Sequence, residues 1–296
     1  SLDLSPLDTS KVTDMDSMFS SCSGLTSLDL SPLDTSKVTS MSSMFSFCSG
    51  LTSLDVSSFD TANVTQMNDM FRNCRSLTSL DVSAFDTSKV TNMKTMFFDC
   101  SGLANLDVSM LNTTAVTNMS WMFANCNKLT SLNVENWNVE KVSSMAYMFA
   151  QCKMLKALNL SKFRTPALSS IDGMFYFCES LEEVKLTNFK TENIRCMGGF
   201  TIMHFGSSKN QYTPQLFGHC KSLKTLDLSS FNTSQVTNMG DMFSNCDSLT
   251  TLTTGANFRF VGTDYSLSGT WQNTAGETFT KGNFPSNIAD TYTKVG

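Results

Sequence analysis

Cysteine recurs in this chain at a fixed interval. Seven cysteines follow one another at 26-residue steps, and a further two repeat that step after one longer interval. They are Cys22, Cys48, Cys74, Cys100, Cys126, Cys152 and Cys178, then Cys220 and Cys246. A strict period predicts one short structural unit that is stacked many times. Because stacked units share a continuous core, the 296 residues need not divide into two globular domains.

Each unit begins at a leucine shortly after a cysteine. These leucines are Leu25, Leu51, Leu77, Leu103, Leu129, Leu155, Leu181, Leu223 and Leu249. Within a unit, Leu28 and Leu30 are two residues apart, which indicates one face of a strand. Met41, Met44 and Phe45 have the i, i+3, i+4 spacing of a helical turn. We therefore expect each coil to contain a short parallel β-strand, a turn, a short helical or 3-10 turn, and a corner at the cysteine.

The predicted fold is a repeat solenoid with 26-residue coils over residues 1–252, beginning with a partial first coil. From about Thr253 the period stops, and Phe258, Trp271 and Phe279 lie in β-prone segments separated by glycines. An open solenoid end exposes a strand edge and core side chains. We therefore expect residues 253–296 to form a small β-rich C-terminal cap. A hinge toward a further domain is the alternative.

The repeating pattern L-T-x-L-D-L-S-x-F-D-T-S-x-V-T-x-M-x-x-M-F-x-x-C resembles the BspA-like leucine-rich-repeat surface proteins of bacteria. This group is also known as the lipoprotein-associated repeat of Bacteroides and Mycoplasma. The resemblance covers about residues 1–252 and implies a leucine-rich-repeat solenoid at the cell surface or secreted, used for adhesion or protein binding. The sequence shows no signal peptide, and we expect the natural product to be longer.

One interval between cysteines is longer than the others. Cys178 and Cys220 are 42 residues apart, which places a 16-residue insertion within residues 198–215. Insertions in solenoids form loops on one face, often the binding face. We therefore treat four residues of the insertion as candidate partner contacts, with a neutral loop as the alternative. They are Phe200, His204, Phe205 and Tyr212.

Charge changes along the chain. Residues 1–110 carry 13 acidic and 6 basic side chains, whereas residues 111–222 carry 7 acidic and 11 basic ones. The early units carry columns of aspartate, which predict either solvated carboxylates held by local hydrogen bonds or, less favourably, bound calcium. Residues 129–197 are the least uniform, and we look there first for specific recognition. The candidate residues in and near this segment are Lys156, Glu183, Lys185 and Lys190.

The cysteine column permits two interpretations. Stacked residues have Cα atoms about 5 Å apart, within the range that disulfides span. However, every side chain of the column would point inward beside Met and Leu, where free cysteine is common. We expect reduced, buried thiols. A zinc ribbon is not indicated, because no C-x-x-C occurs.

The sequence offers little catalytic chemistry. Its two histidines, His204 and His219, lie in no metalloprotease motif, and Walker, Rossmann and nucleophile-elbow motifs are absent. Cys196 and His204 could suggest a nucleophile pair, but no orienting partner is apparent. We expect no enzyme activity, cofactor or metal. The net charge of −5 argues against nucleic acid, and no apolar stretch is long enough for direct membrane insertion.

Two functions remain for a polar repeat protein of this kind. The first is a non-enzymatic adhesion or binding module whose partners are host or neighbouring-cell surface proteins or glycoproteins. The second is a structural stalk or spacer that displays another domain, which the near-identical early units favour. Ice binding by the column Thr26, Thr52 and Thr78 is a minor alternative, because Ala104 and Lys156 interrupt that column.

Overall fold

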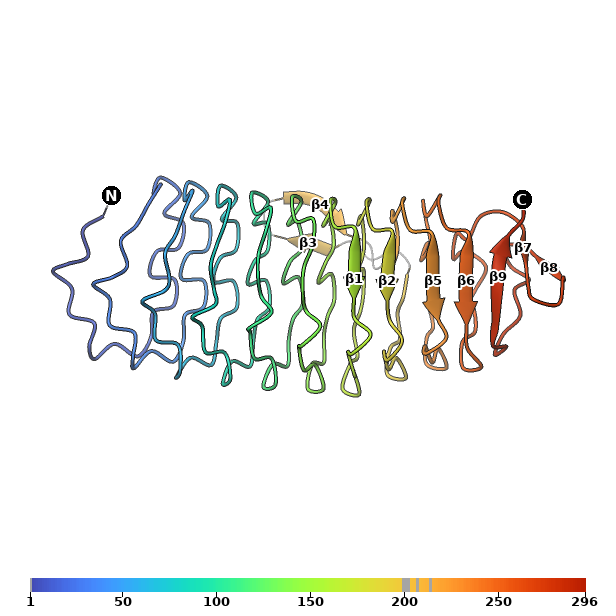
Figure 1. Cartoon of the computed structure of the whole chain (residues 1–296), viewed down its shortest axis with the longest axis horizontal. Coiled ribbons are helices and arrows are strands. Elements are labelled where there is room, and N and C mark those ends of the chain that lie inside the picture. The colour runs from blue at the N-terminus through green and yellow to red at the C-terminus, as the bar shows by residue number, and fades with distance from the viewer. Residues whose placement is uncertain (1, 199–202, 206–207, 213–214) are drawn as a thin grey trace.

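The computed structural model describes residues 2–198, 203–205, 208–212 and 215–296. In these residues the chain forms a straight solenoid, with the N-terminus at one end and the C-terminus at the other (Figure 1). The predicted repeat architecture is therefore present. We number the coils by the sequence repeat. Coil 1 precedes Leu25, coils 2 to 7 begin at Leu25, Leu51, Leu77, Leu103, Leu129 and Leu155, and coils 8 to 10 begin at Leu181, Leu223 and Leu249.

Neighbouring coils are joined by a row of parallel β-bridges just before the first methionine of each unit. The row starts with Asp14 pairing Ser40 and continues at one bridge per coil to Ser144 pairing Ser170. Cys196 pairs Asn238 beyond it. This ladder keeps equivalent residues of successive coils in register, so that each sequence column becomes a row along the solenoid.

The expected helical turn is not formed, and that prediction is wrong: the described residues contain no helix. Alternate backbone N–H groups of this segment donate to the next coil. Ser43 donates to the carbonyl of Asn68 at 2.9 Å and Phe45 to that of Met70 at 2.9 Å. In addition, Ser43 and Phe47 have positive φ angles of 57° and 61°, respectively. A left-handed residue every four positions converts the i, i+3, i+4 pattern into successive β-turns and excludes a helix.

The expected strands form only in the later coils. β1 (Ala157–Asn159) pairs in parallel with β2 (Glu183–Lys185), and β5 (Thr225–Leu228) pairs in parallel with β6 (Thr251–Thr254). In coils 2 to 6 the same segment is extended but is not a paired strand. The segment is only a few residues long and ends in a hydrogen-bonded turn, as between Leu30 and Leu33 in coil 2. These short segments therefore form paired parallel strands only from coil 7 onward.

The core is a set of continuous side-chain rows. The phenylalanine after the second methionine stacks on its counterpart in the next coil, with centroids 5.7 Å apart for Phe45 and Phe71. The row includes Phe19, Phe45, Phe71, Phe97, Phe123, Phe149, Phe175, Phe217 and Phe243. Each coil thereby buries its apolar face against both neighbours, which a single 26-residue unit could not do.

The cysteine column lies inside the core as free thiols. Each thiol from Cys48 onward donates to the carbonyl of a phenylalanine in the preceding coil, as Cys126 does to Phe97 at 3.1 Å. Burial raises the pKa of Cys48 to about 11 and that of Cys74 to about 12. These thiols therefore stay protonated at neutral pH, and each one joins its coil to the backbone of the preceding coil through this hydrogen bond.

The C-terminal tail closes one end of the sheet. β9 (Asp290–Lys294) pairs antiparallel with β6, and β7 (Trp271–Gln272) lies between β9 and β8 (Thr278–Phe279). Trp271 and Tyr292 of the tail are buried against the last coil. The backbone hydrogen bonds that join successive coils continue into the tail, where the sequence period has stopped. The N–H of Phe243 donates to the carbonyl of Tyr265 at 3.0 Å, as the N–H of Phe45 donates to that of Met70.

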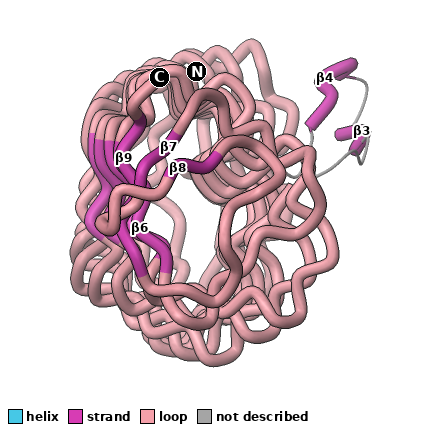
Figure 2. The backbone as a smooth tube through the Cα atoms, turned by 90° about the vertical axis from the view of Figure 1, so that its right-hand side faces the viewer, coloured by secondary structure: helices cyan, strands magenta, loops and turns pink. Residues whose placement is uncertain are grey.

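The insertion contains a β-hairpin. β3 (Met203–Phe205) pairs antiparallel with β4 (Ser208–Tyr212). Viewed along the solenoid, the hairpin projects from the side opposite the strands β6 and β9 (Figure 2). The fold thus separates two surfaces: a strand side and the side from which the insertion emerges.

Candidate partner-binding surface

The strand face is formed by the residues that flank the two inward-pointing apolar residues of each strand segment. In coil 2, Leu28 and Leu30 are buried, whereas Ser27 and Asp29 are exposed. In coil 8, Val184 is buried between exposed Glu183 and Lys185. The inward residues remain Leu, Val or Thr up to coil 10, while the outward ones change. The exposed pair is Ser/Asp in coils 2 to 4, Glu/Lys in coil 8 and Thr/Asp in coil 9.

The charges at the start of the strand side alternate in sign from coil to coil. Lys224 lies 2.6 Å from Glu182 of the neighbouring coil, and Glu183 lies 3.7 Å from Lys185 on the same strand. A second row beside the cysteine corner places Glu179 between Lys153 and Lys221, at 3.8 and 2.9 Å. Exposed pairs of this kind contribute little to stability. Their arrangement nevertheless gives the strand segments of coils 7 to 9 charges of both signs, whereas those of coils 2 to 5 carry aspartate and neither lysine nor arginine.

A shallow depression of about 280 Å³ lies on this face between coils 8 and 10. Its polar lining comes from exposed or half-exposed side chains of β2, β5 and β6 and from Thr187, two residues beyond β2. They are Glu183, Lys185, Thr187, Thr225, Asp227, Thr251 and Thr253. Two carboxylates, an ammonium group and several hydroxyls therefore lie close together on or beside paired strands. Such a surface can hydrogen-bond a polar partner.

The aspartate columns of the early coils are occupied by local hydrogen bonds. Asp29 Oδ1 accepts the backbone N–H of Ser31 at 3.0 Å, and Asp34 Oδ1 accepts that of Ser36 at 2.9 Å. The hydrogen bond from Ser31 lowers the pKa of Asp29, and those from Ser36 lower the pKa of Asp34. Within the described part of the chain, no group of three or more His, Cys, Asp or Glu side chains could hold a metal ion. Local hydrogen bonding accounts for the ladders.

The sequence-derived candidates fall on different parts of the molecule. Glu183 and Lys185 lie on β2, and Lys156 immediately precedes β1 on the same side. Lys190 lies beyond the end of β2, at the next turn, where its N–H donates to Thr165 Oγ1 at 2.7 Å. These four are exposed.

The insertion candidates are on the other side of the solenoid. His204 and Phe205 belong to β3 and Tyr212 to β4, on the hairpin opposite β6 and β9 (Figure 2). Phe200 lies outside the described residues. The structure therefore does not bring the two sets into one site, and a partner of modest size would contact only one of them.

A second apolar cluster lies outside the main core. Trp121 and Tyr147 stack at a centroid distance of 4.1 Å, and Phe98 meets Trp121 edge-on at 5.9 Å. Ala124, Ala150 and Tyr176 complete the buried members. We call this the outer aromatic cluster. Its signal is visible in the sequence, because the column that begins with Ser43 and Asp69 continues as Thr95, Trp121 and Tyr147.

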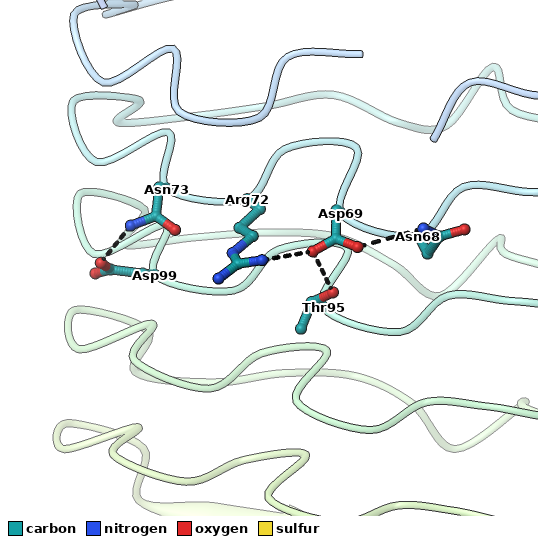
Figure 3. Close-up of polar contacts among 6 residues, drawn as sticks. All are labelled: Asn68, Asp69, Arg72, Asn73, Thr95 and Asp99. Atoms are coloured by element: carbon teal, nitrogen blue, oxygen red, sulfur yellow. Dashed lines mark hydrogen bonds and ion pairs between the residues drawn. The ribbon is translucent and has the colours of Figure 1, made fainter. Parts of the chain in front are cut away.

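Polar residues continue this cluster toward the N-terminus (Figure 3). Asp69 accepts a hydrogen bond from Thr95 at 2.7 Å and pairs with Arg72 at 3.2 Å. Asn73 donates to Asp99 at 3.0 Å. The guanidinium of Arg72 also lies 5.4 Å from the ring centre of Phe98. Burial raises the pKa of Asp99, although Arg75 at 2.6 Å opposes this shift. These contacts link coils 3 and 4 laterally.

Cys196 and His219 each make local contacts, whereas the side chain of His204 lies outside the described part of the chain. Cys196 donates to the carbonyl of Gly198 at 3.0 Å, and burial raises its pKa to about 11. His219 stacks on Phe177 at 3.8 Å, and burial lowers its pKa. A thiol with a raised pKa is a poor nucleophile at neutral pH.

Comparison with solved structures finds repeat proteins at low similarity. A leucine-rich cell surface protein from Faecalibacterium prausnitzii A2-165 is 17% identical with a TM-score of 0.32, covering 80% of this chain and 75% of its own. A TLR13 complex with single-stranded RNA is 18% identical with a TM-score of 0.29, covering 76% of this chain and 36% of its own. Neither likeness is close enough to transfer a function.

No curated protein matches the sequence. Within the described ranges, no helix has the length and apolar character needed to cross a membrane. The family described as "Mycoplasma protein of unknown function, DUF285" matches residues 1–105, 102–210 and 199–265. These matches follow the coils from the first to the tenth and span most of the chain. The chain belongs to this DUF285 family.

Proposed function

We propose that this chain is a non-enzymatic binding module of a bacterial cell-surface or secreted protein. Its partners would be surface proteins or glycoproteins of a host or of neighbouring cells. The proposal rests on one observation: the outward residues of the strand face change in coils 7 to 9, while the inward residues keep their apolar character. A structural spacer needs only the inward, apolar residues of each strand segment, because these form the core. Changing the outward residues adds recognition without a cost to the core.

Rigidity supports the same proposal. Glu183 and Lys185 project from β2, which pairs in parallel with β1 of the preceding coil. Asp227 projects from β5, which pairs in parallel with β6 of the following coil. A binding surface on such strands loses little conformational entropy when a partner docks. Exposed side chains of both signs favour a polar macromolecular partner over a small apolar ligand.

The experiment replaces the strand-face residues of coil 8 by those of the early coils, as Glu183→Ser with Lys185→Asp. Binding is measured by biolayer interferometry against immobilised host-cell surface glycoproteins. A matched variant, Ser53→Glu with Ser79→Lys, adds the same two charges to coils 3 and 4. We expect the coil 8 variant to lose at least about tenfold in affinity, which corresponds to about 1.4 kcal/mol. The matched variant should bind like the wild type.

The alternative is a structural spacer, which the uniform coils 2 to 4 favour. In these coils the exposed Ser/Asp pair repeats without change. If the wild-type chain binds none of the glycoproteins, or if the coil 8 variant binds with unchanged affinity, the spacer or a different surface is supported.

A further inference from the structure

The turn edge between coils 6 and 7 departs from the repeat. Where coil 3 reads Ser57-Ser-Phe-Asp-Thr-Ala62, coil 6 reads Glu135-Asn-Trp-Asn-Val-Glu140. This edge lies at the far end of the strand segments from the cysteine corner. It contains a depression of about 320 Å³ that is separate from the one on the strand face.

The walls of this depression carry opposite charges. Glu135 and Glu140 stand on the coil 6 side, and Lys162 and Arg164 stand on the coil 7 side. Glu140, Lys162 and Arg164 are exposed, and Glu135 is half-buried. Two carboxylates therefore face two cations across an open space.

In the described chain these four groups form no direct ion pair with one another. Among the ion pairs of the described chain, none joins a carboxylate of coil 6 to a cation of coil 7 within 4.0 Å. On the strand side of the solenoid, by contrast, opposite charges of neighbouring coils do meet, as at 2.6 Å between Lys224 and Glu182. Glu135 instead accepts a hydrogen bond at 2.8 Å from the amide of Asn159 in coil 7, which joins its carboxylate to the neighbouring coil without neutralising its charge.

We propose that this depression binds a peptide segment of a partner protein that carries a basic and an acidic side chain close together. The basic side chain would pair with Glu135 and Glu140, and the acidic one with Lys162 and Arg164. Asn136 and Asn138 on the same rim provide amide groups for the peptide backbone. The charges come from successive coils, whose backbones lie roughly 4.8 Å apart, so that one short peptide segment can reach both coils.

This inference rests on the proposed function, because it names the chemistry of a protein partner. It is tested by selecting a random linear-peptide library on the wild-type chain. A charge-swapped variant, Glu140→Arg with Arg164→Glu, and a neutral variant, Glu140→Gln with Arg164→Gln, are compared by titration with the selected peptides. Both positions are exposed, and thermal unfolding checks that the variants fold. The control swap, Glu182→Lys with Lys224→Glu, exchanges charges that already pair.

We expect selected peptides to contain a close acidic and basic pair and to bind both variants about tenfold or more weakly, with the control swap unaffected. Peptides without such a pair, or equal binding to the swapped variant, would overturn the inference. If those peptides instead lose affinity on the coil 8 variant, the inference fails while the proposed function stands. If neither peptides nor surface glycoproteins bind the wild type, both fail.

Discussion

The thiol of Cys74 donates a hydrogen bond to the carbonyl oxygen of Phe45, which precedes it by 29 residues, at 3.1 Å. The same oxygen accepts the backbone N–H of Cys48 at 3.1 Å. One cysteine column therefore supplies two donors to each carbonyl of the phenylalanine row, one from its own coil and one from the next. This explains why the residue at the corner is a small, buried donor.

The cysteine column should contribute to stability through this hydrogen bond. Cys126→Ala removes the donor to Phe97 and should lower the free energy of unfolding by about 1 kcal/mol. Cys196→Ala is the control: it also removes a thiol donor, to the carbonyl of Gly198, but at a half-buried position outside the column, so it should have a smaller effect. Urea denaturation followed by circular dichroism measures both. Equal losses would show that the column position has no special role.

Alkaline pH should weaken the fold through the same residues. Burial raises the pKa of Cys74 to about 12, above the ordinary value of 9.0. A raised folded-state pKa contributes stability that is present below pH 9 and is lost as pH rises toward 12. The penalty of Cys126→Ala should therefore shrink between pH 8 and about pH 10, since the unfolded wild type gains thiolates there. A penalty that is constant with pH would contradict the assignment.

Gly173 should be intolerant of any side chain. Its φ is +54°, and an added Cβ would lie 2.3 Å from Cε1 of Tyr147 in the outer aromatic cluster. Gly173→Ala should destabilise by about 2–3 kcal/mol, from steric overlap and the left-handed backbone. Gly24→Ala is the control, because nothing lies within 4 Å of its added Cβ. Thermal unfolding of the two variants should differ clearly; equal melting temperatures would refute the contact.

Val139 interrupts a row of buried threonines. Thr165 Oγ1 donates to the carbonyl of Lys190 at 3.1 Å, and the equivalent threonines of other coils make the same bond. Valine cannot donate to Arg164 in this way. Val139→Thr should therefore stabilise by about 1 kcal/mol, whereas the reverse change Thr165→Val should cost about 1–3 kcal/mol. Chemical denaturation of both variants tests the pair, and destabilisation by Val139→Thr would contradict it.

The exposed aspartates should act as turn caps and not as ion ligands. Asp81 Oδ1 accepts the N–H of Ser83 at 2.9 Å, which lowers its pKa. Its stabilising effect is present above pH 4 and is lost as pH falls. Asp81→Asn keeps the acceptor and should leave the melting temperature at pH 7 unchanged, whereas Asp81→Ala should lower it. Added calcium should not alter the melting temperature; a calcium-dependent rise would contradict the capping role.

The period made the solenoid and its buried rows predictable, because Leu28, Met41 and Cys48 occupy columns that only stacking can bury. The backbone between the methionines was not predictable. Ser43 and Phe47 adopt left-handed conformations that non-glycine residues seldom prefer, and they do so because their N–H groups pair with the next coil. Local spacing cannot reveal such inter-coil bonds.

The candidate partner-binding surface was predictable only in part. Glu183 and Lys185 replace the Ser and Asp of the repeat, so they could be identified from the sequence as candidates, and they lie on the strand face. Thr225 and Asp227, which line the same depression, were not identified. The outer aromatic cluster was not predicted, because Trp121 and Tyr147 are 26 residues apart in the chain. Their contact at 4.1 Å arises only when positions 26 residues apart are placed side by side.

The most direct test of the binding role is hydrogen–deuterium exchange of the wild-type chain with and without a bound surface glycoprotein. The account predicts slowed exchange on the strand face of coils 8 and 9, at residues 183–187 and 225–229. The equivalent residues 53–57 and 79–83 of the early coils should be unchanged. Protection of the early coils alone, or no protection of any strand segment in the complex, would contradict a partner-binding surface on the later coils.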